Sequence, residues 1–123
     1  MQPLALVFYE RVMPGSQLPT KLESLGYRVA VVNATKDFLP TVKSLKPFVI
    51  IADVATKNKD VCPIISLIRE DPELKHIPII AITDSSDKRL EVTARESGAN
   101  LVVSEAAILM HLKPLLDQAI AID

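Results

Sequence analysis

The chain has 123 residues, of which 49% are hydrophobic and 24% are charged, with a formal net charge of -1 and one cysteine. This length suits one domain over residues 1–123. The balanced charge gives no electrostatic reason to expect nucleic acid or a membrane surface as the main partner. Cys62 has no second cysteine to pair with, and no export signal is recognisable, so we expect a cytoplasmic protein. The longest apolar run covers only residues 48–52, so we expect no transmembrane segment.

Five short, β-branched, apolar stretches predict strands. They cover residues 4–8, 28–32, 48–52, 77–83 and 101–103. Nearly unbroken hydrophobic runs of this length are typical of parallel strands that are covered on both faces.

Segments with helical spacing of apolar residues follow each predicted strand. In chain order these residues are Leu18, Leu22 and Leu25; Leu39, Val42 and Leu45; Ile64, Ile65 and Ile68; Leu90 and Ala94; and Ile108, Leu112, Leu115, Leu116 and Ala119. Gly26 and Gly98 suit helix C-termini, and two prolines in "EDPELKHIP" end the third helix. Prolines in the first, second and fifth segments predict helices that start late or bend.

The order βαβαβαβαβα predicts an α/β fold, a doubly wound parallel sheet with helices on both faces. In such a sheet ligands bind outside the carboxyl ends of the strands, so the candidate residues are those that follow each strand. They are Tyr9 and Glu10, Asn33 and Thr35, Asp53, Thr83 with Asp84, and Ser104 with Glu105.

Asp53 directly follows a buried strand and has two functional interpretations. Glu10, Asp53 and either Asp60 or Asp84 could converge as oxygen ligands for Mg²⁺, although each could equally cap a helix or face water. Asp53 could also accept a phosphoryl group, which requires Mg²⁺ and a Lys or Arg beside the moving oxygens. Without these partners it is a polar residue at the end of a strand.

The remaining candidates favour structural roles. Neither "GSQ" nor "ESGAN" matches a Walker or dinucleotide fingerprint. His76, in a polar loop, and His111, on a helix, have no metal-ligand spacing to each other or to Cys62, which fits a packed position at a helix start. Ser85 and Ser86 fit a helix N-terminus better than a nucleophile with its base.

Two stretches, "KPFVIIADVATKNKDVCPIISLIREDPELKHIPIIAIT" at residues 46–83 and "ESGANLVVSEA" at residues 96–106, resemble the receiver domains of bacterial two-component response regulators. The first is similar to the third strand, third helix and fourth strand of that family, and the second to its turn into the fifth strand. The resemblance extends over almost the whole chain. It implies a flavodoxin-like (βα)5 sheet of strand order 2-1-3-4-5 and a role in phosphorelay signalling.

The resemblance also implies roles for single positions. Asp53 occupies the phosphoacceptor position, and Thr83 occupies the position of the conserved hydroxyl. The acidic pair that holds Mg²⁺ falls on Tyr9 and Glu10, so Glu10 and Asp53 would be the metal ligands and one carboxylate is missing. The lysine after the fifth strand is replaced by Glu105, followed by alanine where the family has a cis-forming proline.

Other positions depart from the family pattern as well. The aromatic switch residue is replaced by Val102, the small residue after the hydroxyl by Asp84, and the proline four residues after the acceptor by Lys57. Glu105 in place of lysine turns attraction for a phosphoryl group into repulsion, which changes the local energy by several kcal/mol for charges ~4 Å apart at a dielectric near 20. Relaxation of Glu105 toward water, or charge from Lys57 or Lys59, would offset part of this penalty.

These departures predict a pseudo-receiver that binds protein partners, such as a histidine kinase or an output protein, and is not an enzyme beyond impaired autophosphorylation and dephosphorylation of Asp53. The expected partner or homodimer surface comprises the fourth helix, fifth strand and fifth helix, with Leu90, Val92, Arg95 and Met110. One alternative is a working receiver that a histidine kinase phosphorylates on Asp53. Another is a small-ligand or flavin-binding module, which the lack of tryptophan and of a phosphate-cradling loop disfavours.

Overall fold

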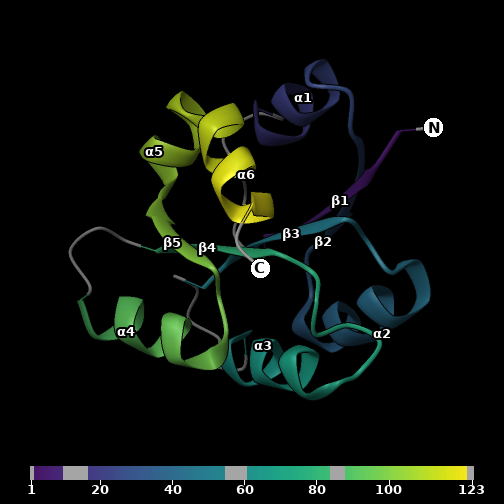
Figure 1. Ribbon diagram of the computed structural model, residues 1–123, viewed down its shortest axis with the longest axis vertical. Coiled ribbons are helices and arrows are strands. Elements are labelled where there is room, and N and C mark those ends of the chain that lie inside the picture. The colour runs from purple at the N-terminus through teal and green to yellow at the C-terminus, as the bar shows by residue number, and fades with distance from the viewer. Residues whose placement is uncertain (1, 10–16, 55–60, 84–87, 122–123) are drawn as a thin grey trace.

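Five parallel strands form the centre of the fold, with helices on both sides (Figure 1). The computed structural model describes residues 2–9, 17–54, 61–83 and 88–121. The elements are β1 (Leu4–Phe8), α1 (Gln17–Ser24), β2 (Arg28–Val32), α2 (Thr35–Leu45), β3 (Val49–Asp53), α3 (Val61–Glu70), β4 (Ile79–Thr83), α4 (Lys88–Ser97), β5 (Leu101–Ser104), α5 (Glu105–Met110) and α6 (Leu112–Ala121). None of these helices is long and apolar enough to cross a membrane.

The strand order is β2-β1-β3-β4-β5, and every neighbouring pair is parallel. The predicted doubly wound sheet of order 2-1-3-4-5 is therefore confirmed. All five residues of β3 and of β4 are buried, as expected for strands covered on both faces. Strand β3 begins and ends one residue later than predicted, so Asp53 is its last residue.

Alternating strand residues divide the core into two layers. On β3, Ile50 and Ala52 face the layer that contains residues of α2, α3 and α4, whereas Val49 and Ile51 face the layer of α1, α5 and α6. Figure 1 shows these two groups of helices on opposite sides of the sheet. In the first layer the rings of Phe8 and Phe38 stack with centroids 4.7 Å apart.

The single helix predicted after the last strand is two helices in the structure. α5 ends at Met110 and α6 begins at Leu112, with His111 between them at φ -128° and ψ 36°. Pro114 explains the break, because proline has no N–H to donate to the carbonyl four residues earlier, which belongs to Met110. The expected bend at this proline is confirmed, and His111 lies at the break and not within a helix. Pro40, by contrast, lies inside α2, which begins five residues before it.

A half-buried arginine, Arg69, joins the segments that lead into β4 and β5. The Arg69 guanidinium donates to the backbone carbonyls of Gly98, Lys75 and Ile77, each at 2.7 Å, and to the side-chain oxygen of Asn100. That Asn100 oxygen also accepts from the first N–H of β4 at 2.8 Å. Burial lowers the pKa of Arg69. These contacts fix the starts of both strands, and therefore the positions of the residues at their carboxyl ends.

Candidate functional site

Two buried polar side chains lie at the carboxyl edge of the sheet. Asp53 ends β3 with no exposed surface, and Thr83 ends the neighbouring β4 with 7% exposed. Within the described part of the chain they are the two buried polar or charged residues. Burying a carboxylate is costly unless it has partners, and Asp53 does interact with another group. The structure therefore brings together the two residues predicted for the phosphoacceptor and hydroxyl positions.

A hydrogen bond joins the residue after β1 to the first residue of α5. Tyr9 is 4% exposed, and its hydroxyl donates to the Oε2 carboxylate oxygen of Glu105, which is half-buried. Whether Glu105 would turn toward water beside a phosphorylated Asp53 stays a prediction. Its carboxylate takes the hydroxyl of Tyr9 as a partner, so the two residues that depart most from the family pattern contact each other.

The start of α5 holds Glu105 in this position. The Ser104 side chain caps the helix by accepting from the N–H of Ala107 at 3.1 Å. Glu105 is then the first residue of the helix, where the unpaired backbone N–H groups favour a negative charge. The local sequence "SEAA" thus fixes a carboxylate at the carboxyl edge of the sheet.

Little space remains beside the Tyr9–Glu105 bond. The adjoining cavity has a volume of ≈ 10 Å³ and is lined by apolar residues of β4, α1 and α5, among them Leu18, Ile82 and Ile108. Such a volume is about that of one water molecule. Among the described residues, the Tyr9 ring and these side chains therefore leave space for about one water molecule beside the bond.

Comparisons with known proteins identify the fold. No protein-family model and no curated protein sequence matches the chain. The receiver domain of a sensor histidine kinase from Pseudomonas aeruginosa, with magnesium in its active-site cleft, matches with a TM-score of 0.85 at 20% identity over 98% of each chain. A histidine-kinase receiver domain from Syntrophus aciditrophicus gives 0.83 at 23% identity over 97% of this chain and 90% of that chain. A Thermotoga maritima response regulator gives 0.82 at 19% identity over 98% and 99%.

The chain has the receiver fold. At these identities the likeness shows the fold, and the roles of individual residues rest on the positions they occupy. Val102, which the resemblance predicts at the aromatic switch position, is half-buried in the strand β5 and packs against the α2, α3 and α4 layer. An aliphatic side chain there cannot make the polar and ring contacts of an aromatic residue.

Several predicted residues fall outside the part of the receiver fold that the structure describes. They are Glu10, Lys57, Lys59, Asp60, Asp84, Ser85 and Ser86. The roles expected for Glu10 as a metal ligand and for Lys57 or Lys59 as substitute cations therefore stay predictions.

We call Tyr9, Asp53, Thr83 and Glu105 the carboxyl-edge site. The histidines and the cysteine do not belong to it. His76 and His111 are both exposed. Cys62 is buried in α3, and burial raises the pKa of its thiol, although a hydrogen bond with Ser97 opposes this. A protonated, packed thiol is a poor nucleophile, in agreement with a structural role.

Tyr9 and Glu105 were predicted as two separate departures from the receiver pattern, and the bond between them was not predicted. One feature of the sequence could have indicated this bond. Both residues follow predicted strands at their carboxyl ends, and a tyrosine hydroxyl can donate to a glutamate carboxylate. Ninety-six positions separate them, so only the fold brings the pair together.

Replacing Tyr9 with phenylalanine is expected to lower the free energy of unfolding by about 1–2 kcal/mol, because a charge-assisted hydrogen bond is lost and Glu105 stays half-buried. Urea unfolding followed by circular dichroism measures this loss. Tyr27→Phe is the matched control, since Tyr27 is half-buried in the same core layer but has no hydroxyl bond to Glu105. Equal losses for the two variants would contradict a stabilising role of the Tyr9–Glu105 bond.

Proposed function

We propose that this protein is a degenerate receiver that works in two-component signalling by binding other proteins, without phosphorylation of Asp53. The supporting observation is the hydrogen bond between Tyr9 and Glu105. It lies where the resemblance places one Mg²⁺-binding carboxylate and the lysine that stabilises the phosphoryl group. A hydroxyl and a carboxylate that bond to each other stand at the predicted positions of an anion and a cation that would both act on phosphate.

Charge is the reason that this replacement matters. A phosphoryl group on Asp53 would add about two negative charges, and its transfer depends on positive groups around the moving oxygens. Glu105 adds a further negative charge at the same edge of the sheet. The Tyr9 hydroxyl offers one donor, and Glu105 already takes it. The described side chains therefore disfavour phosphoryl transfer to Asp53.

The described residues at this edge also fit Mg²⁺ poorly. The ion prefers octahedral oxygen coordination with one or two carboxylates and several waters. Tyr9 presents a neutral hydroxyl whose proton points to Glu105. We therefore propose that the protein acts without bound Mg²⁺.

A working receiver is the second candidate, and the burial of Asp53 beside the end of β4 favours it. In that case the P–N bond of a kinase phosphohistidine would break, and a P–O bond to an Asp53 oxygen would form. Glu10 would then hold the metal. The receiver domain from Pseudomonas aeruginosa contains such a coordinated magnesium ion.

Mg²⁺ with beryllofluoride, which mimics an aspartyl phosphate, is expected to leave the amide spectrum of the protein near Asp53 and Thr83 unchanged. Two-dimensional ¹⁵N spectra recorded through a titration measure the response. A receiver known to bind beryllofluoride, treated in parallel, shows that the reagent is active. A saturable shift of the amide signals around Asp53 would contradict the proposal of a degenerate receiver and would favour a working receiver.

The proposed partner surface includes the exposed side of α4. Val92 is 52% exposed, and Arg95 is exposed in an ion pair with Glu91 at 3.6 Å. Met110 is 75% exposed but lies beside α1, in a groove with Leu25. We propose that a histidine kinase, an output protein or a second copy of the chain docks on the α4 and β5 side, and that Met110 belongs to a separate surface.

A further inference from the structure

A groove of ≈ 480 Å³ lies at the amino ends of the strands, at the opposite edge of the sheet from Asp53 and Thr83. We call it the amino-edge groove. It is formed where β1 and β2 begin, where α2 passes into β3, where the loop with His76 reaches β4, and where α6 ends. Neither the receiver positions nor the carboxyl-edge site uses these residues.

Two large apolar side chains are exposed in the amino-edge groove. Leu45 is 45% exposed and Phe48 is 47% exposed, although one side of the Phe48 ring packs near Tyr27 with centroids 6.5 Å apart. Prolines at positions 3, 47 and 78 form part of the walls. Because proline fixes its own φ, the groove is largely preformed, and a ligand loses little free energy in ordering it.

The charged groups that line the amino-edge groove are basic. Arg28 is held at the start of β2 by a hydrogen bond from its Nε to the carbonyl of Gln2 at 3.3 Å. Lys46 follows α2 in the left-handed conformation, with φ 45°. His76 is the third basic residue of the lining, and none of the described lining residues is acidic.

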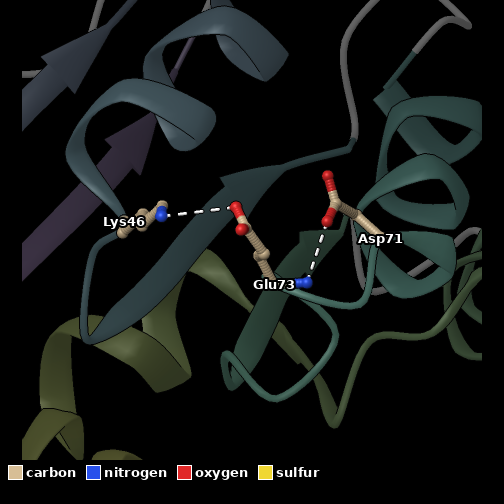
Figure 2. Close-up of polar contacts among 3 residues, drawn as sticks. All are labelled: Lys46, Asp71 and Glu73. Carbon is tan, nitrogen blue, oxygen red and sulfur yellow. Dashed lines mark hydrogen bonds and ion pairs between the residues drawn. The ribbon is translucent and has the colours of Figure 1, made fainter.

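A neighbouring carboxylate shows what Lys46 can bind. Figure 2 shows its Nζ paired with Glu73 at 3.3 Å, while Asp71 accepts from the backbone N–H of Glu73 at 2.9 Å. The side chains of Lys46 and Glu73 are 57% and 73% exposed, so water screens this pair and it contributes little to stability. A carboxylate that also reaches Arg28 can therefore displace Glu73 at small cost.

We propose that the amino-edge groove binds an acidic segment of a partner protein that also carries a large apolar side chain. The apolar side chain would cover Leu45 and Phe48, and the carboxylates would pair with Arg28 and Lys46. Burial of an apolar anchor provides affinity, and the complementary charges provide orientation. With the proposed surface on the α4 and β5 side, the protein then has two separate docking surfaces and can bridge two partners.

The proposal can be tested with the pentapeptide Glu-Leu-Glu-Phe-Glu, whose termini are capped so that they carry no charge. In ¹⁵N spectra we expect saturable shifts at Leu45, Lys46, Phe48 and His76, with Asp53 unaffected. The affinity should fall as the salt concentration rises from 50 to 500 mM, because exposed charges are screened. A peptide with lysine for each glutamate, and one with serine for leucine and phenylalanine, should not bind.

Matched variants distinguish the groove from general surface binding. Leu45→Ser and Arg28→Gln are each expected to weaken the peptide about tenfold. Leu67→Ser, at a leucine 49% exposed on α3, and Lys36→Gln, at an exposed lysine at the far end of α2 from the groove, should leave its affinity unchanged. Thermal melting shows which variants remain folded.

Three results would overturn the proposal. They are no saturable shift at millimolar peptide, equal weakening by the groove and control variants, and concentration-dependent shifts at Leu45 and Phe48 without peptide. The last result, with a dimer in sedimentation, would assign the groove to a second copy of the chain. None of these results depends on whether Asp53 can be phosphorylated.

Discussion

Replacing Tyr9 with aspartate and Glu105 with lysine is expected to give the protein a beryllofluoride response that the native chain lacks. The two substitutions restore the carboxylate and the cation that the receiver pattern has at these positions, and they remove the Tyr9–Glu105 bond. An attraction then replaces a repulsion for a phosphate-like group at Asp53, the predicted phosphoacceptor, which changes the local energy by several kcal/mol for charges ~4 Å apart. Amide spectra should show saturable shifts around Asp53 and Thr83.

The same double variant should be less stable without metal, because Asp at position 9 is a buried charge next to Asp53. Mg²⁺ at about one hundred times its dissociation constant should raise the stability by about 2.7 kcal/mol, or roughly 10 °C in Tm. Glu105→Gln is the control, since it removes the repulsion without supplying a cation. If the double variant stays folded but does not respond, Tyr9 and Glu105 are not what prevents phosphate-like binding.

Replacing Gly98 with alanine is expected to lower the free energy of unfolding by about 3 kcal/mol. Gly98 has φ +125°, which L residues rarely adopt, and an added Cβ would lie 2.3 Å from Cγ of Arg69. Arg69 would have to move away from the carbonyls of Lys75, Ile77 and Gly98 that it binds. Urea unfolding measures the loss.

Gly26→Ala separates backbone strain from the Arg69 contact. Gly26 also ends a helix with a positive φ of +95°, but an added Cβ would meet nothing within 4 Å. We expect a loss of about 1 kcal/mol from strain alone. If Gly98→Ala lowers the free energy of unfolding no more than Gly26→Ala does, the loops around Arg69 rearrange at a smaller cost than their hydrogen bonds imply.

Local patterns in the sequence predicted most of the fold. The uninterrupted apolar runs predicted buried parallel strands, since a strand covered on both faces needs apolar residues at every position, as β3 and β4 have. Gly26 and Gly98 marked the ends of α1 and α4 because their positive φ suits glycine. The break at His111 was foreseen only as a bend, because Pro114 removes a hydrogen bond without specifying where the helix resumes.

The candidate site was predictable in part. Asp53 and Thr83 were found because both end buried strands, and the carboxyl ends of parallel strands share one edge of the sheet. The Tyr9–Glu105 bond was not predicted, because a hydrogen bond depends on side-chain position to within a fraction of an ångström. Spacing along the chain does not contain that information.

The sequence by itself determined the five strands, most of the helices, the doubly wound sheet and the edge at which Asp53 and Thr83 meet, because each depends on hydrophobic period or on the order of the elements. Only the tertiary structure decided that Tyr9 and Glu105 satisfy each other, and that Arg28, Lys46 and Phe48 surround one groove. These residues come from different segments, and the physical reason is common to both cases. Contacts between distant segments depend on the packing of the whole core, whereas strands and helices depend mainly on their own residues.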